Sequence, residues 1–392
     1  MKTKLFLQQE VQQYIHDHLD SDISKMAFKK SPFEDIDMID LLTQIESKKK
    51  SKDKLPTWFN TNNILFPKKL SIEQTSSEQC AHYKASLFRG ESIIDLTGGF
   101  GIDCYYFSKN FKHVLHCEMQ EDLSEIVRLN NSALAVQNIQ CHTGDSLAYL
   151  KDNAQTWDYI YVDPHRRNDA KEKVFFLSDC APNVPEHLDL LFSRSNNIVI
   201  KTSPLLDIHA GINELTNVKS IHIVALQNEV KELLWHLEKD YTGHVSLIAA
   251  NITKEETQIF STTLDSDSEA KFSEPLQYLY EPNAAILKTG KFNEVSTNYE
   301  LYKLHPHSHL YTNEQLIPFA GRSFKIKQIL PYNKQTAKEY LTNLKANVTI
   351  RNFPLKVEEI RKKWKIKDGG DTYLFFTTNL KNEKIIIVTT KA

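Results

Sequence analysis

The order of apolar and polar positions changes twice along the chain. Residues 1–85 carry apolar side chains at helical spacing, as in "FLQQEVQQYIHDHL" and "MIDLLTQIESKKK". In "SSEQCAHYKASLF", either Ser76 or Ser77 is suited to cap a further helix. From residue 92 to about 262, short β-rich runs recur, with helical segments between most of them. Strands alternating with helices predict a parallel sheet covered by helices on both faces.

Seven β-rich runs define this sheet. The last two lie closer together in sequence, so we expect them to form an antiparallel pair at one edge of a seven-stranded sheet. The runs are "SIIDL", "HVLHCE", "IQCHTGD", "YIYVD", "NIVIKTS", "SIHIVAL" and "VSLIAAN".

The C-terminal part follows a different pattern. A polar, turn-rich segment at residues 262–275 predicts a boundary, and Pro282 suits the first turn of a helix. After residue 322, the chain reads strand, helix, strand, helix and hairpin, the hairpin being "TYLFFTTNLKNEKIIIVTT". We therefore expect a second, smaller α/β region.

The run "IIDLTGGFG" places three glycines within four positions directly after a predicted strand. It lacks the lysine of a P-loop and the third glycine of a dinucleotide-binding turn. Asp95 precedes the turn and would repel a phosphate. An acid at this point suits a cationic ligand, such as the sulfonium and amino-acid end of S-adenosylmethionine.

Acidic residues also follow the next three predicted strands. Glu118 could accept hydrogen bonds from ribose hydroxyls, Asp145 could contact an adenine amine, and Asp163 begins "DPHRR". Open α/β sheets bind ligands at the carboxyl ends of their strands. Four acids in this order therefore support a nucleoside-type cofactor.

Residues 92–200 resemble a class I S-adenosylmethionine-dependent methyltransferase, because "DLTGGFG" corresponds to the glycine loop of that family. Thr97 replaces its first glycine, as it does in some rRNA and tRNA methyltransferases. Residues 76–392 also resemble a bacterial group with a ferredoxin-like insert and a THUMP-like domain, through "KTSPLLD", "QNEVKELLWHL" and "YEPNAAILKTG". The resemblance implies cofactor contacts from these residues: Asp95, Thr97, Gly98, Gly99, Gly101, Glu118, Met119, Asp145, Ser146 and Asp163.

The fold that follows is α/β, with a seven-stranded Rossmann-like methyltransferase sheet, an N-terminal helical region and C-terminal small α/β domains. The expected divisions are an N-terminal helical region, a methyltransferase domain, a ferredoxin-like domain and a THUMP-like domain. Their ranges are 1–85, 86–265, 276–321 and 322–392.

The "DPHRR" motif is the candidate acceptor site. It keeps the acid and first proline of the amine-methylating D/N-P-P-aromatic pattern, and it is nearer the D-P-P-R form of several RNA methyltransferases. We expect catalytic roles for Asp163, Pro164, Arg166 and Arg167, with nitrogen methylation of a guanine preferred. The two arginines could instead form internal salt bridges. Residues Lys201, Ser203 and Pro204 could border this pocket, and the helix with Tyr83 and Lys84 could cover the cofactor.

Charge is distributed unevenly along the chain. Residues 322–392 hold 16 Lys or Arg and 6 Asp or Glu, which gives +10, whereas the whole chain carries −2. A basic end on an acidic body suggests a polyanion partner, here tRNA or rRNA. In "RKKWKIK", Arg361, Lys362, Lys363, Lys365 and Lys367 surround Trp364 and could contact RNA; a helix end with a buried tryptophan is the alternative.

Other features of the sequence narrow the class of protein and the kinds of site that it could contain. The five cysteines form no CxxC pair, and Cys180 reads as a structural thiol, so we expect neither zinc nor a cysteine nucleophile. His305, His307 and His309 alternate, but they lack the further ligands of a metal site. No apolar run is long enough to cross a bilayer, and we expect a cytoplasmic protein. Two alternatives remain: a methyltransferase acting on a small molecule or protein, and a non-catalytic RNA-binding protein.

Overall fold

The computed structural model describes residues 3–166 and 176–392. The chain divides into two compact units. Unit 1 is Met1–Lys219 with Leu233–Gly243, and unit 2 is Ser220–Glu232 with His244–Ala392. In the described residues, no helix is both long enough and apolar enough to cross a membrane.

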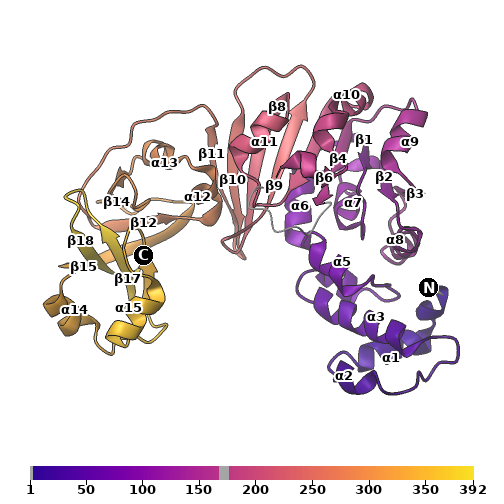
Figure 1. Cartoon of the computed structure of the whole chain (residues 1–392), viewed down its shortest axis with the longest axis horizontal. Coiled ribbons are helices and arrows are strands. Elements are labelled where there is room, and N and C mark those ends of the chain that lie inside the picture. The colour runs from indigo at the N-terminus through magenta and orange to yellow at the C-terminus, as the bar shows by residue number, and fades with distance from the viewer. Residues whose placement is uncertain (1–2, 167–175) are drawn as a thin grey trace. The chain divides into compact units, whose positions relative to one another are not determined.

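Helices form the N-terminal part of unit 1 (Figure 1). Their buried side chains pack together with Phe100, Ile102, Leu123 and Ile126 of the sheet region. Of the two serines that the sequence offered as caps, Ser77 caps α6 by accepting a hydrogen bond from the backbone N–H of Cys80. The helical elements are η1 (Thr3–Leu7), α1 (Gln9–Asp17), α2 (Ile23–Met26), α3 (Met38–Ser51), α4 (Pro56–Asn60), α5 (Lys69–Gln74) and α6 (Glu78–Ser86).

The sheet of unit 1 has the strand order β9-β7-β4-β1-β2-β3. Its first five strands along the chain run parallel, and β9 is antiparallel to β7. The strands are β1 (Gly90–Asp95), β2 (Phe111–Glu118), β3 (Ile139–Thr143), β4 (Tyr159–Val162), β7 (Asn197–Thr202) and β9 (Glu229–Glu238). The helical and short elements between them are α7 (Ile102–Phe107), α8 (Glu121–Ala133), α9 (Ser146–Asp152), β5 (His165–Arg166), η2 (Leu177–Asp179), β6 (Cys180–Ala181), α10 (Val184–Arg194) and α11 (Ile208–Glu214).

In the described residues the sheet has nine strands, not the seven that were predicted, and its predicted edge is also corrected. β8 (Val218–Leu226) and β10 (Ser246–Ile252) contain the last two predicted runs, and they pair in parallel, not antiparallel. The antiparallel partner of β10 is β11 (Thr257–Thr263), which was not predicted. β9 was missed too, because "EVKELLWHLE" consists largely of good helix formers and its buried run of six residues does not alternate.

Seven further strands of unit 2 form one sheet in the order β13-β14-β12-β15-β18-β17-β16. The elements after residue 322 match the predicted strand, helix, strand, helix and hairpin. Asn283 caps α12, so Pro282 ends a strand, and the prediction that it opens a helix was wrong. The elements are β12 (Tyr278–Pro282), α12 (Ala284–Thr289), α13 (Phe292–Asn298), β13 (Tyr302–Lys303), β14 (Tyr311–Asn313), β15 (Gly321–Pro331), α14 (Lys334–Leu341), β16 (Asn347–Ile350), α15 (Val357–Trp364), β17 (Tyr373–Thr378) and β18 (Lys384–Lys391).

The long strand β15 pairs with a different strand on each of its edges. Its residues 321–325 pair with β12, and its residues 324–331 pair with β18. Both pairings are antiparallel. One strand therefore joins the segments on either side of residue 320 into a continuous sheet.

Candidate active site

The glycine turn lies between β1 and α7. The backbone N–H of Gly98 donates to the carbonyl of Cys117 at 2.8 Å, and the N–H of Gly101 donates to the carbonyl of Gly98 at 2.9 Å. A Cβ atom on Gly98 would lie 2.3 Å from the ring of His116. Only glycine therefore fits at position 98 without moving the turn or the ring.

His116 supports the turn from near the carboxyl end of β2, and sequence reasoning missed it. Its ring is fully buried, and Nε2 lies 3.1 Å from the carbonyl oxygen of Gly99. Burial lowers the pKa of His116, so the ring is neutral and Nε2–H donates to that carbonyl. A histidine inside an apolar strand run gave no signal beyond its position.

Thr97 connects the ends of two strands. Its hydroxyl accepts a hydrogen bond from the backbone N–H of Asp163 at 2.7 Å and lies 3.2 Å from Oδ1 of Asp95. The residue that departs from the glycine pattern is thus a bridge between β1 and the end of β4. Glycine at this position would leave the N–H of Asp163 without this partner.

Asp95 is a buried acid at the end of β1, with 1% of its surface exposed. Its carboxylate accepts hydrogen bonds from the N–H of Thr97 at 2.9 Å and from Sγ of Cys104 at 3.3 Å. Burial raises the pKa of Asp95 to about 7, and the nearby Asp103 and Asp163 add to the rise. A cation placed here would relieve the cost of ionising a buried carboxylate.

Glu118 lies against the same turn. Its Oε2 accepts a hydrogen bond from the N–H of Gly99 at 3.0 Å, and its Oε1 accepts one from Gln120 N at 2.8 Å. Each oxygen keeps a second lone pair. Met119, next in sequence, is 73% exposed.

Asp145 and Ser146 lie at the end of β3. The Oδ1 of Asp145 accepts hydrogen bonds from the N–H groups of Leu147 and Ala148 at 2.8 and 3.0 Å, so this carboxylate caps α9. Ser146 is buried. The structure thus brings Asp95, Glu118 and Asp163 to the glycine turn, whereas the carboxylate of Asp145 contacts the start of its own helix.

The "DPHRR" segment begins at the end of β4. Asp163 forms an ion pair with Lys201 at the end of β7, and Pro164 is buried. Arg166 forms the second residue of β5, where its backbone pairs with that of Cys180. The Arg166 side chain and all of Arg167 lie outside the described residues, so the roles predicted for both arginines stay predictions.

A buried charge network lies under the turn, and it includes a residue that the sequence did not single out. Asp103, in the first turn of α7, pairs with Nζ of Lys84 at 2.9 Å and accepts hydrogen bonds from Ser76 and from Tyr161 at 3.1 and 2.9 Å. Burial opposes ionisation of Asp103, but Lys84 and then Lys201 lower the pKa of this carboxyl below its ordinary value. The side chain of Lys84 links α6 to α7 with no exposed surface, and the expectation that its helix covers the cofactor stays a prediction.

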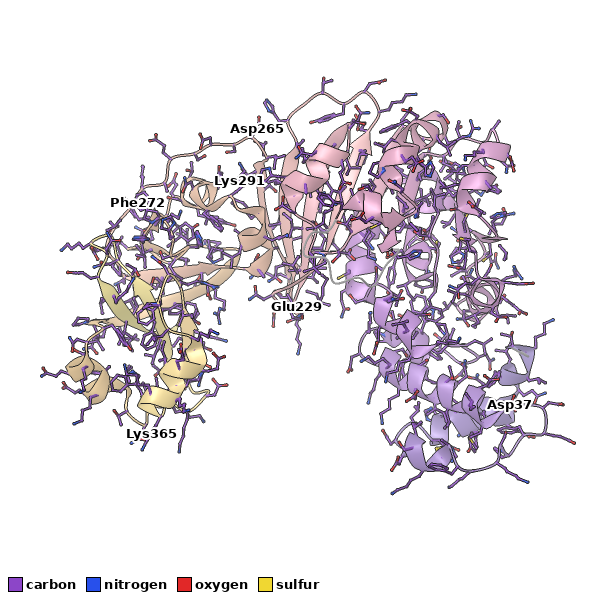
Figure 2. All side chains as sticks on the ribbon, viewed as in Figure 1. Asp37, Glu229, Asp265, Phe272, Lys291 and Lys365 are labelled. Atoms are coloured by element: carbon purple, nitrogen blue, oxygen red, sulfur yellow. The ribbon has the colours of Figure 1, made fainter. Side chains whose placement is uncertain are left out.

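The predicted RNA-contact residues lie at the end of α15, where Lys365 is labelled in Figure 2. Lys362, Lys363, Lys365 and Lys367 are exposed, whereas Arg361 pairs with Asp368 at 2.5 Å. Trp364 is buried in the core of this region, so it offers no face for base stacking. Burial of Trp364 argues against base stacking by this side chain, whereas phosphate contact by the surrounding basic residues stays a prediction.

The alternating histidines of unit 2 have structural contacts. His305 is buried, and its Nδ1 accepts a hydrogen bond from the N–H of His307 at 3.1 Å. His309 stacks on Phe292 at 3.6 Å between centroids, and burial lowers its pKa to about 4. In residues 3–166 and 176–392, no group of three or more His, Cys, Asp or Glu is placed to hold a metal ion.

The chain is similar to two domain families and to a solved structure of full length. A THUMP domain-like family model matches residues 321–391, and a ferredoxin-like domain model matches residues 278–319. A protein of Porphyromonas gingivalis W83, described as a "putative methyltransferase", superposes with a TM-score of 0.89 at 30% identity over 98% of both chains. No curated protein matches the sequence.

More distant structures resemble only part of the chain. A Streptococcus mutans protein solved with SAH gives a TM-score of 0.30 at 15% identity, over 41% of this chain and 96% of its own. An rRNA methylase of Streptococcus thermophilus gives a TM-score of 0.30 at 15% identity, over 41% of this chain and 95% of its own. These low scores carry no argument. Through its full-length match at 30% identity, the chain belongs to the family of the P. gingivalis protein, with a class I methyltransferase fold followed by ferredoxin-like and THUMP-like domains.

Proposed function

We propose that this protein is an S-adenosylmethionine-dependent methyltransferase that acts on a base nitrogen, preferably of guanine, in tRNA or rRNA. The observation that carries the proposal is the buried acid Asp95 directly before a glycine turn in which a Cβ atom at position 98 would strike the His116 ring, so the backbone there stays bare. Such a site favours a ligand with positive charge that approaches the backbone closely. The methionine end of the cofactor has both properties.

The residues present fit this cofactor. Asp95 would face its positive charge, and Glu118 retains lone pairs for the two ribose hydroxyls. Met119 is exposed at the same edge and would offer an apolar surface to the adenine. Asp145 would contact the adenine amine through the oxygen that does not cap α9.

When bound, the cofactor supplies a methyl group on a positively charged sulfur. The protein's part is to orient the acceptor nitrogen and to receive its proton. Asp163 is suited to both tasks because its backbone is held by Thr97 and its carboxylate is one-third exposed. A carboxylate can accept a hydrogen bond from an N–H group and then the proton itself.

Cofactor affinity is expected to rise with pH up to about 7. The pKa of Asp95 is about 7, so below that pH the carboxyl must lose a proton to face a cation. Affinity should fall by about tenfold per pH unit below 7. Calorimetry with S-adenosylmethionine from pH 5.5 to 8, in two buffers of different ionisation enthalpy, measures both affinity and proton release.

Asp95→Asn provides the control for this titration. It should bind more weakly at pH 8, and the part of the pH dependence due to residue 95 should vanish. The free energy of unfolding should change with pH in the opposite direction to cofactor affinity. Because the pKa of Asp95 in the folded protein lies above the ordinary 3.8, the contribution of Asp95 to stability falls as pH rises from about 4 to 7. A wild-type affinity that is constant over this range, without proton release, would contradict the role of Asp95.

The basic C-terminal region supports RNA as the acceptor. Residues 322–392 carry a charge of +10, and lysines 362, 363, 365 and 367 are exposed around one helix end. Lysine contacts with phosphates make affinity steeply salt-dependent, which contacts with a small molecule do not. The same charge near a helix C-terminus also complements the helix dipole, so its effect on binding must be measured.

Replacing these four lysines with glutamine is expected to weaken RNA binding at least about tenfold at 0.1 M salt. The slope of log affinity against log salt should become shallower by about 2.8 to 3.6, because each of the four phosphate contacts contributes about 0.7–0.9. Fluorescence titration with pooled tRNA and rRNA fragments measures both quantities. The matched control changes four exposed lysines of unit 1 to glutamine, namely Lys25, Lys49, Lys112 and Lys151; an equal loss in both variants would point to charge alone.

Two other functions remain as outcomes of these tests. Cofactor binding with salt-insensitive or no RNA binding would favour a methyltransferase of small molecules or proteins. RNA binding with no cofactor affinity would favour a non-catalytic RNA-binding protein. Nucleoside mass spectrometry of total RNA, with and without the gene, identifies the base and atom.

A further inference from the structure

Lys201 and Asp163 present a hydrogen-bond donor and acceptor side by side. The parallel register of β4 and β7 pairs Val162 with Ile200, so the next residues, Asp163 and Lys201, lie level at the carboxyl ends of their strands. Their side chains form an ion pair, with Asp163 33% and Lys201 12% exposed. An ammonium group only donates and a carboxylate only accepts, so the pair is polar in a fixed direction.

The turn after β7 places the side chain of Leu205 in contact with solvent. The hydroxyl of Ser203 accepts a hydrogen bond from the N–H of Leu205 at 3.2 Å, and its carbonyl accepts one from the N–H of Leu206 at 3.1 Å. Leu206 is fully buried, and α11 begins two residues later, so both ends of the turn are fixed. Leu205 is 75% exposed at the sheet edge that carries Asp163.

Leu205 is one of several large apolar side chains that are exposed in the described residues, and its place just after β7, at the edge that carries Asp163, makes it a candidate contact for a ligand. Burying a leucine side chain stabilises a fold, and Leu205 forgoes most of that stabilisation. A flat ring placed beside Lys201 and Asp163 would cover it. The two observations are independent, because one rests on charge and the other on apolar surface.

We propose that Lys201 and Leu205 recognise the acceptor base, an inference that rests on the proposed function. Asp163 accepts a hydrogen bond from the N–H of the base, Lys201 donates to an adjacent carbonyl oxygen, and Leu205 covers one face of the ring. The base must therefore carry an N–H next to a carbonyl oxygen, as guanine and uracil do. Guanine fits better, because it has a second N–H on the same edge for the carboxylate.

The transfer step balances with these groups. The acceptor nitrogen forms a bond to the methyl carbon, and the electrons of the carbon–sulfur bond stay with sulfur. The nitrogen then loses its proton to the Asp163 carboxylate, which later releases it to water. Lys201 keeps its proton throughout and acts only by hydrogen bonding and charge.

The test measures methyl transfer by the purified protein to RNA that is isolated from a strain lacking the gene. Wild type is compared with Lys201→Met, Lys201→Arg and Leu205→Ala. All three variants should bind S-adenosylmethionine within about twofold of wild type. The kcat/KM for RNA should fall by about 10–100-fold in Lys201→Met and about tenfold in Leu205→Ala, because a charged hydrogen bond or an apolar contact is lost.

Two controls separate recognition from folding. Leu70→Ala removes a leucine of α5 that is 62% exposed, and it should leave transfer unchanged. Lys201→Arg should recover part of the loss, because a guanidinium also donates to a carbonyl oxygen. Nucleoside mass spectrometry of the product should find the methyl group on guanine or uracil.

The possible outcomes distinguish a failure of this inference from a failure of the proposed RNA methyltransferase activity. If wild type methylates RNA and Lys201→Met and Leu205→Ala do so with unchanged kcat/KM, the inference alone is overturned. A methyl group on adenine or cytosine would also overturn it. Cofactor binding without any transfer to RNA by wild type would overturn the RNA function and this inference with it.

Discussion

Gly98→Ala is expected to bind S-adenosylmethionine about 10–100-fold more weakly than wild type. The new Cβ would lie 2.3 Å from the buried ring of His116, a separation that atoms do not adopt. Either the turn or the ring must move, and overpacking of this kind costs about 1–3 kcal/mol. Calorimetry measures the affinity, and thermal unfolding reports how much of the cost falls on the fold.

A double variant tests whether the clash is the cause. His116→Ala opens space beneath position 98, so Gly98→Ala should lose less affinity in that background than in wild type. Gly290→Ala is the control for glycine itself, because Gly290 has a positive φ of 72° with nothing within 4 Å of the added atom. A steric role for His116 would be contradicted if Gly98→Ala and Gly290→Ala lost equal cofactor affinity. It would also be contradicted if the losses of Gly98→Ala and His116→Ala simply added in the double variant.

Asp163→Asn is expected to lower the rate of methyl transfer by about 100–1000-fold, within the range that a positioned proton acceptor contributes. The amide keeps the size of the carboxyl group but cannot take a proton. S-adenosylmethionine affinity should change by less than about fivefold, because the backbone N–H of residue 163 still donates to Thr97. Single-turnover transfer at saturating RNA and cofactor measures the chemical step.

Glu91→Gln is the matched control for Asp163→Asn. It also breaks a carboxylate–lysine pair, with Lys112 at 2.8 Å, but both side chains are about two-thirds exposed. Such a surface pair contributes little, so transfer and stability should stay near wild type. If Asp163→Asn also transferred methyl groups at the wild-type rate, another group would have to receive the proton.

The sequence predicted the parallel core of the fold because each strand there is a local apolar run. β8 and β10 were located correctly, but their direction depends on β9, which enters between β7 and β8 in the strand order and reverses the chain. A continuous apolar run of helix-forming residues does not reveal such a strand. β11 was missed because its exposed side chains left too few apolar positions.

The site was predictable where it depends on strand ends. Asp95, Glu118 and Asp163 each follow a recognisable strand, and topology alone brings strand ends to one edge. His116 and Asp103 were not found, because their roles depend on packing against a turn and on a lysine 19 residues earlier in the chain. Thr97 was noticed as a departure, but its bridge to Asp163 spans 66 residues and is visible only in three dimensions.

The strand β15 has a consequence for how this protein can be divided. The two family models meet between residues 319 and 321, yet residue 321 begins a strand that pairs with β12 on one side and with β18 on the other. A cut at that point would leave β12 without a partner on one edge and expose the matching edge of β15. The two segments that sequence comparison treats as separate domains therefore share one sheet, and we expect a fragment that ends at residue 320 to be less soluble than one that keeps both.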